Sequence, residues 1–461
     1  MKINLGYLLF ISLIAALGGL LFGYDWVVIG GAKPFYEQFF HIAGYPNLQG
    51  WAMSSALAGC IPGALMAGEL SDRFGRKKTL IVAALLFTLA GIGTGMINTL
   101  TGFIVYRLVG GIGIGLASAI SPVYISEVSP PHLRGRFVSI NQLTIVIGIL
   151  AAQIVNYLIA RPVPEHATDM YILHSWNGQT GWRWMFWAET FPAFAFLVMI
   201  LFVPESPRWL AKVSRWKESV AILNRIGGVA YAESARQEIA GTLAAENNKV
   251  DYRKLFNPRI RPILWIGIIL AVFQQWCGIN VVFNYAEEVF TAAGYGVNDI
   301  LFNIVITGTI NLIFTLVAMR TVDRWGRKKL MLFGAAGLAI TYIFLGTSYY
   351  FAWKGVAILI IIILAMAVYA MSLAPVTWVV LSEIFPNQVR GAAMSVATAA
   401  LWIACFVLTY TFPVLRFHLK IYGAFWLYAS ICVAGFLYIF SRLPETRGKS
   451  LEEIEKQLTG E

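Results

Sequence analysis

The chain has 461 residues and a formal net charge of +11, and 58% of its residues are hydrophobic while only 13% are charged. A soluble domain is about half apolar and about a quarter charged, so this composition excludes a water-soluble enzyme, a disordered chain and a small disulfide-linked scaffold. The apolar residues form continuous runs rather than alternating ones, which argues against a transmembrane β-barrel.

Apolar runs follow one another along the whole chain, each close to the ~20 residues that a helix needs to cross a bilayer. They lie at 5–31, 51–70, 79–98, 101–124, 137–160, 183–203, 261–292, 299–320, 330–352, 355–382, 392–414 and 422–441. We therefore predict an all-α membrane protein with twelve transmembrane helices, and we expect the lipid bilayer as a partner.

Charged residues in the connecting segments predict the orientation. With the N-terminus inside, the inner segments carry 28 Lys and Arg residues and the outer segments carry 6. Cytoplasmic segments are the ones enriched in Lys and Arg, so we expect both termini in the cytoplasm of a plasma membrane, as in a bacterial inner membrane. This distribution accounts for the net charge of +11 without a nucleic-acid partner.

The polar segments divide the chain into parts. We predict an N-terminal six-helix half at 1–203, a short cytoplasmic helical linker domain at 204–258, a C-terminal six-helix half at 259–443 and a cytoplasmic tail at 444–461. Within the linker, helical patches are expected at 216–226 and 232–246.

Cysteine and histidine positions give no sign of a metal site. The cysteines at 60, 277, 405 and 432 lie inside apolar runs without metal-ligand spacing, and we expect them to be small core residues. The histidines fall in or near predicted loops, so a proton carrier inside the membrane must be a carboxylate. We expect no metal, no cofactor and no enzymatic activity, because no span pairs a nucleophile with a base.

Three motifs occur twice, in the same order. The pairs are DRFGRKK at 72–78 and DRWGRKK at 323–329, SE-x2-P-x3-RG at 126–135 and 382–391, and PES at 204–206 and PET at 444–446. The two copies of the first motif follow spans two and eight, those of the second follow spans four and ten, and those of the third follow spans six and twelve. This indicates a duplication of six spans with parallel topology, as in the two halves of major-facilitator transporters, and predicts a substrate site between the halves.

Further motifs make the similarity specific. They are FGYD at 22–25, PESPRWL at 204–210, QQ-x2-GIN at 274–280 and PETRG at 444–448. With them, the chain resembles the sugar porter family of the major facilitator superfamily over essentially its whole length. Within that family it is most similar to the bacterial proton-coupled xylose porters and is related to the glucose facilitators.

Three charged residues lie within predicted spans of the N-terminal half, where a charge is costly and often functional. Asp25, Arg107 and Glu189 each lie some six residues from the outer end of a span, at about 9 Å depth with about 1.5 Å rise per residue. Two acids and one base at one depth predict a proton-coupling site, with Glu189 the weaker candidate; the alternative is a static ion pair. The resemblance implies that an acid at Asp25 belongs to proton-coupled porters.

Buried amides are expensive in a bilayer unless they bind something, and they both donate and accept, so they suit sugar hydroxyls. Aromatic faces suit the C–H surface of a sugar ring. The resemblance implies sugar contact for Gln142, Gln274, Gln275, Asn280, Asn311, Trp378 and Trp402, with Tyr285, Phe22 and Gln153 secondary. For a single amide the alternative is a hydrogen bond between helices. Gly278 and Ala374–Pro375 are expected to let their helices bend.

Four positions depart from the proton-coupled xylose porters. Those porters have Gln where this chain has Leu401 and Ile149, an aromatic residue at Leu373 and Tyr at Asn284. Two amides fewer mean fewer partners for sugar hydroxyls, so the preferred monosaccharide is left open between pentoses and hexoses.

The repeated cytoplasmic motifs carry the remaining candidates. The resemblance implies an ion-pair network that holds the two halves together when the cavity faces outward, and the alternative is a topology signal alone. The candidate residues are Asp72, Arg76, Glu127, Arg134, Asp323, Arg327, Glu383 and Arg390.

The function expected from these features is proton-coupled symport of a monosaccharide, by a protein that works as a monomer. Sodium coupling or uncoupled facilitated diffusion of the same sugars is the second hypothesis. A sugar sensor that does not transport is the third, although the tail at 444–461 is short for signalling.

Overall fold

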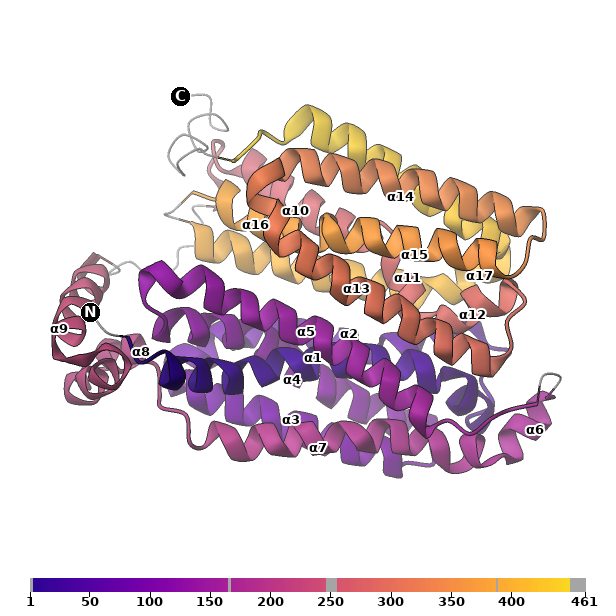
Figure 1. Cartoon of the computed structure of the whole chain (residues 1–461), viewed down its shortest axis with the longest axis horizontal. Helices are drawn as coiled ribbons and strands as arrows, with labels where there is room; N and C mark the ends of the chain where they lie inside the picture. Colours follow the sequence, from indigo (N-terminus) through magenta and orange to yellow (C-terminus); the bar gives the residue numbers. More distant parts are fainter. Residues whose placement is uncertain (1–2, 165–166, 246–254, 387–388, 448–461) are drawn as a thin grey trace.

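The computed structural model describes residues 3–164, 167–245, 255–386 and 389–447, and every secondary-structure element in these residues is a helix (Figure 1). The prediction of an all-α protein is confirmed. Ten helical stretches in the described part of the chain are long and apolar enough to cross a bilayer. One of them, the 53-residue α17, is long enough for two spans, and the 19-residue α7 corresponds to the predicted sixth span.

The N-terminal half forms one layer of the molecule, drawn in indigo to magenta in Figure 1. Its long helices are α1 (Leu5–Phe39), α2 (Pro46–Phe74), α3 (Arg76–Met96), α4 (Leu100–Val128), α5 (Pro131–Ile159) and α7 (Trp182–Ile200). The short α6 (Asp169–His174) and the π-helical turn η1 (Asn177–Gly181) lie in the outer loop between α5 and α7.

The C-terminal half forms the second layer, and two of its spans are broken. Its helices are α10 (Arg261–Trp276), α11 (Ile279–Asn284), α12 (Ala286–Ala292), α13 (Val297–Trp325), α14 (Arg327–Tyr350), α15 (Val356–Met371), α16 (Leu373–Ile384) and α17 (Arg390–Arg442).

The breaks fall near the predicted bends. The seventh span divides at Gly278, whose φ of 89° is left-handed and favours glycine. The tenth span divides at Ser372, just before the Ala374–Pro375 pair in the first turn of α16, where proline's missing N–H costs nothing. The predicted loop between the eleventh and twelfth runs is shorter than expected, because α17 departs from helical geometry only at Lys420, with φ 60° and ψ 174°.

The linker contains α8 (Pro207–Lys212) and α9 (Trp216–Ala245), which is bent at Gly228 with φ 77°. Both lie at the end of the N-terminal half that carries its repeated charged motifs, at the left in Figure 1. The predicted patches at 216–226 and 232–246 correspond to the two arms of α9, although residue 246 lies outside the described residues. Most of the predicted tail, 448–461, also lies outside them.

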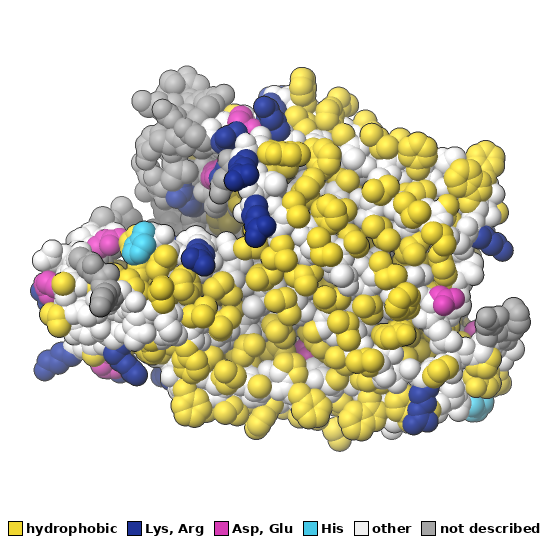
Figure 2. Space-filling view, viewed as in Figure 1, with side chains coloured by type: hydrophobic (Ala, Val, Ile, Leu, Met, Phe, Trp, Pro, Cys, Tyr) yellow, Lys and Arg dark blue, Asp and Glu magenta, His cyan; other side chains and the backbone are white. Residues whose placement is uncertain are grey.

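The surface between the two ends of the molecule is apolar. Figure 2 shows hydrophobic side chains over most of the visible face, with Lys and Arg gathered mainly toward the end that carries α9. Large apolar side chains such as Phe191, Phe202 and Phe344 are more than half exposed on this belt. A soluble protein would not leave so wide an apolar surface in water, whereas lipid tails cover it without cost.

The described contacts between the two halves lie toward the ends that are opposite to the repeated charged motifs. Trp26 packs against Phe283, Trp51 against Phe406 and Tyr410, and Tyr157 against Phe302. At the outer loop, the Val163 N–H donates to Asn298 Oδ1, and Asn298 Nδ2 donates to the Val163 carbonyl. The halves are thus joined on the side opposite to the repeated charged motifs.

Candidate functional site

The three charged residues predicted at one depth come together in the structure. Asp25 of α1 and Arg107 of α4 form an ion pair through Oδ1 and Nη1, and Arg107 Nη2 donates to the Asp25 carbonyl oxygen at 3.2 Å. Glu189 of α7 lies within electrostatic reach of both. All three are 2% exposed. Two carboxylates therefore share one guanidinium in a buried site, and Asp25 Oδ2 has no hydrogen-bond partner among the described residues.

The amides of the seventh span form a chain of hydrogen bonds at the Gly278 break. Gln274 Nε2 donates to the Tyr369 hydroxyl oxygen at 2.9 Å. Gln275 Nε2 donates to Gln274 Oε1, and Asn280 Nδ2 donates to Gln275 Oε1. The break brings Asn280 back toward Gln275, five residues earlier. All three amides are buried, and Asn280 Oδ1 remains without a partner among the described residues.

Two predicted aromatic residues bridge the halves beside these amides. Phe22 of α1 lies edge-on to Trp402 of α17, with ring centroids 5.6 Å apart. Trp402 is buried, and its Nε1 has no hydrogen-bond partner in the described part of the chain. Cys405 lies one turn after Trp402 on α17, and its Sγ is 3.7 Å from Asn280 Nδ2. The Tyr285 hydroxyl donates to the Thr409 carbonyl at 2.6 Å, so this phenol supports helix packing.

The other predicted sugar contacts lie on separate helices of both halves. Gln142 is half-buried on α5, Asn311 is buried on α13 and Trp378 is half-buried on α16. No hydrogen bond within the described residues links these three side chains to the amide chain. Gln153 is buried on α5 and faces α13, where a Cβ at Gly308 would collide with its side-chain oxygen.

The repeated charged motifs form the same arrangement in each half. Arg76 binds Glu127 through two hydrogen bonds of 2.9 Å, and Ser206 Oγ donates to the same carboxylate. In the second half Arg327 Nη2 lies 3.1 Å from Glu383 Oε1, and Thr446 Oγ1 donates to Glu383 Oε2 at 2.6 Å.

The remaining members of the predicted network have other partners. Asp72 pairs with Arg76 at 3.1 Å and with Lys212 at 3.0 Å. Arg134 and Arg390 donate to the backbone carbonyls of Ser126 and Phe385. The Asp323 side chain lies outside the described ones. The ion pairs described at this end stay within one half or join the N-terminal half to the linker, so a network joining the halves in an outward-facing state stays a prediction.

The repeated Pro-Glu motif caps a helix in each half, a role that the sequence analysis did not assign. Glu205 Oε1 accepts from the backbone N–H groups of Arg76 at 2.9 Å and Lys77 at 3.1 Å. Burial raises the pKa of Glu205, although these N–H donors oppose the rise. Glu445 Oε1 accepts from the Arg327 N–H at 2.9 Å in the same way. The repeated motif thus places a carboxylate at the N-terminus of α3 and of α14.

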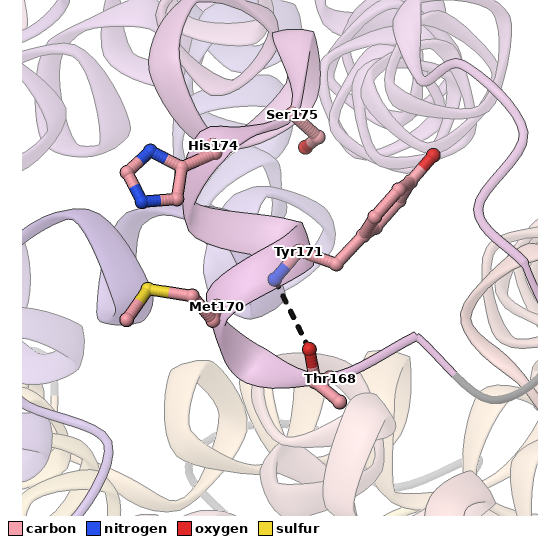
Figure 3. A pocket seen from close by; sticks show the side chains of 5 residues that line it. All are labelled: Thr168, Met170, Tyr171, His174 and Ser175. Atoms are coloured by element: carbon pink, nitrogen blue, oxygen red, sulfur yellow. Dashed lines mark hydrogen bonds between the residues drawn. The ribbon is translucent and has the colours of Figure 1, made fainter.

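Two features lay outside the predicted site. Lys33, which follows the first predicted span and is one of the six Lys and Arg residues of the outer segments, is buried among carboxylates of both halves. The signal in the sequence was its spacing of four from Glu37 and the presence of Glu287 and Glu288 inside an apolar run. Figure 3 shows a shallow surface hollow at α6, where Tyr171 N donates to Thr168 Oγ1 at 3.3 Å; it contains none of the predicted site residues.

Comparison with known proteins gives a consistent result over the whole chain. The family described as "Sugar (and other) transporter" matches residues 11–458. The chain belongs to this family. It is 39% identical to the D-xylose-proton symporter of Escherichia coli (strain K12), over 98% of this chain and 96% of that protein. It is 38% identical to the arabinose-proton symporter of Bacillus subtilis (strain 168), over 98% of this chain and 95% of that protein.

A solved structure supports the fold. The inward-open conformation of the xylose transporter XylE from E. coli matches with a TM-score of 0.85 and 39% identity, covering 98% of this chain and 99% of that one. The predictions of a sugar porter and of the major-facilitator fold are confirmed, and the chain is a multi-pass membrane protein of a transporter family.

Proposed function

We propose that this protein imports a monosaccharide together with a proton by alternating access. The observation that carries the proposal is the buried group of Asp25, Arg107 and Glu189 in a chain whose relatives include proton symporters for two pentoses. With all three ionised, the site holds one excess negative charge. A bilayer-buried charge without a partner is costly, so one proton bound to this pair of acids restores neutrality.

The geometry gives the proton a mechanical consequence. Arg107 holds α1 to α4 through the Asp25 carboxylate and the Asp25 backbone carbonyl. When Asp25 takes a proton from outside, the attraction to Arg107 weakens and α1 is released from α4. Sugar binding then closes the outer side, and the proton leaves on the cytoplasmic side.

The sugar lies between the halves in this proposal. Gln274, Gln275 and Asn280 bind ring hydroxyls, Gln142 and Asn311 flank the ring, and Trp378 and Trp402 face its C–H surface. The amide chain at the Gly278 break supports this assignment, because its hydrogen bonds are easily exchanged for those of a hydroxyl. The side chains of Leu401 and Ile149 cannot form the hydrogen bonds that amides would form at these two positions. Fewer hydroxyls of the bound sugar therefore have a protein partner than in the xylose porters, and this difference affects which pentose or hexose is preferred.

The remaining assignments of the proposal concern location, assembly and the parts of the chain; the orientation rests on the charge distribution. The protein lies in a bacterial plasma membrane with both termini in the cytoplasm, acts as a monomer and performs no enzymatic reaction. Its functional parts are the halves 1–203 and 259–443, joined by the linker 204–258 and followed by the tail 444–461.

Sugar uptake into proteoliposomes with and without an inward proton gradient tests coupling. Wild type should concentrate a sugar from a pentose and hexose panel only with the gradient. Asp25→Asn, which removes the acid and keeps its shape, should bind sugar but no longer concentrate it. Asp299→Asn, at an exposed outer position, is the matched control and should behave as wild type.

The outcomes separate the competing functions. Concentration by Asp25→Asn would show that another group couples the proton. Equal uptake by wild type with and without a proton gradient would identify a facilitator, uptake that follows a sodium gradient would identify a sodium symporter, and sugar binding without any uptake would identify a sensor.

A further inference from the structure

A second buried charge cluster lies at the outer end of the interface between the halves, away from Asp25. Lys33 of α1 is 2% exposed, and its Nζ lies 3.0 Å from Glu37 Oε2, 2.9 Å from Glu287 Oε2 and 2.8 Å from Glu288 Oε1. An ammonium group has three N–H donors, so each can serve one carboxylate. Glu287 and Glu288 begin α12 in the opposite half, and Lys33 therefore ties α1 to α12 when the outer side is closed.

The cluster contains more negative than positive charge. Its second cation is Arg416 of α17, whose Nη1 lies 3.4 Å from Glu288 Oε1. We call Lys33, Glu37, Glu287, Glu288 and Arg416 the outer-gate cluster. Fully ionised, its two cations face three carboxylates. An excess charge buried at an interface is costly, and a carboxylate in this position takes up a proton instead.

Glu37 is the carboxylate with the weakest compensation. Glu287 is 26% exposed and reaches water, while Glu288 is shared by Lys33 and Arg416. Glu37 has only its share of Lys33 and the neutral amide of Gln49, whose Nε2 donates to Glu37 Oε2 at 2.9 Å. Its other oxygen, Oε1, is buried without a hydrogen-bond partner in the described part of the chain, as is Glu288 Oε2, so the difference between the two lies in the second cation that Glu288 has in Arg416.

The neighbouring helices do not change this balance among the described residues. Tyr36 on α1 and Tyr285 before α12 lie within electrostatic reach of the cluster, but phenols are neutral at physiological pH. Arg107 on α4 acts on Tyr36 and already pairs with Asp25. Helix α2 contributes only the neutral Gln49.

We propose that the outer gate binds one proton on Glu37 each time it closes, so that acidity outside the cell favours the closed gate. The proposal rests on the alternating access proposed above. On opening, Lys33 and Glu37 stay with one half, and Glu287, Glu288 and Arg416 move with the other. Each carboxylate then meets water and ionises, and the proton returns to the outside. It is a gating proton, separate from the one carried at Asp25.

The direction of the pH effect follows from linkage. The closed gate binds one proton more than the open gate, so raising the pH favours opening, by up to tenfold in the closed-to-open ratio per pH unit. The ratio of closed to open gate depends on pH only between two limits. Below the ordinary glutamate pKa of about 4.3, Glu37 is protonated in both the open and the closed gate, and above its pKa in the closed gate it is ionised in both.

A distance measurement across the gate tests the proposal without relying on transport. Cysteines placed at Asn47 on α2 and Thr291 on α12, both exposed, carry spin labels, and the four native cysteines are buried. The two label populations are measured by pulsed electron resonance in full-length protein from about pH 5 to about pH 9, which spans the glutamate titration range. In wild type the longer-distance population should grow as the pH rises.

Matched variants identify the group responsible. Glu37→Gln keeps the shape of the side chain and removes the excess charge, so the gate should stay closed at every pH. Glu287→Gln removes the same charge from the other half and should give the same flat profile. Asp299→Asn, an outer carboxylate outside the cluster, should titrate as wild type.

The outcomes are decisive in both directions. A flat wild-type profile, or a full pH slope retained in both Glu37→Gln and Glu287→Gln, would overturn the proposal. A slope lost in Asp25→Asn would assign the pH response to the transport proton and would also overturn it. A slope retained in Asp25→Asn supports a separate site, whatever the uptake assay shows about coupling.

Discussion

Replacing Gln275 by alanine tests the sugar site most directly. Gln275 donates to Gln274 Oε1 and accepts from Asn280 Nδ2, so its amide holds the middle of the chain at the Gly278 break. The side chain is 5% exposed, and its removal leaves neighbouring polar groups and a sugar hydroxyl unpaired. Each unpaired buried group costs about 1–3 kcal/mol, so sugar affinity should fall by about fivefold to over a hundredfold.

The assay is competition binding of a pentose and hexose panel to purified protein. Asn156→Ala is the matched control, because Asn156 is an equally buried amide that donates to the Val28 carbonyl at 2.9 Å within the N-terminal half. It should lower thermal stability and leave sugar affinity unchanged. Unchanged affinity in both Gln274→Ala and Gln275→Ala would move the sugar site elsewhere, and equal loss in Asn156→Ala would indicate a general packing effect.

Two further variants extend the test. Leu401→Gln, next to Trp402 on α17, should strengthen xylose binding in the same competition assay. The gain should equal about one hydrogen bond, or ~0.5–1.5 kcal/mol. Unchanged xylose affinity would mean that position 401 does not face the sugar. Glu383→Gln should loosen Arg327 and Thr446 at the cytoplasmic end and slow transport cycles without changing which sugars compete. An altered sugar ranking in Glu383→Gln would contradict a purely conformational role.

The sequence determined the number and order of the spans, because the bilayer requires a continuous apolar run of fixed minimum length for each crossing. It also determined that Asp25, Arg107 and Glu189 lie at one depth, since the rise of a helix converts distance from its end into depth. The break at Gly278 was readable for a similar local reason: glycine adopts the left-handed backbone that ends one helix and starts the next.

Pairings between distant segments were decided only by the tertiary structure. Lys33 and Glu287 are 254 residues apart, and hydropathy marks one as a loop cation and the other as part of a span. Likewise, the sequence placed Arg76, Glu127 and Arg134 in one network without assigning the pairs. Packing places Glu127 against Arg76 and leaves Arg134 on a backbone carbonyl. Electrostatic partners depend on which helix ends meet, and in a transporter that alternates between two arrangements the sequence is compatible with both.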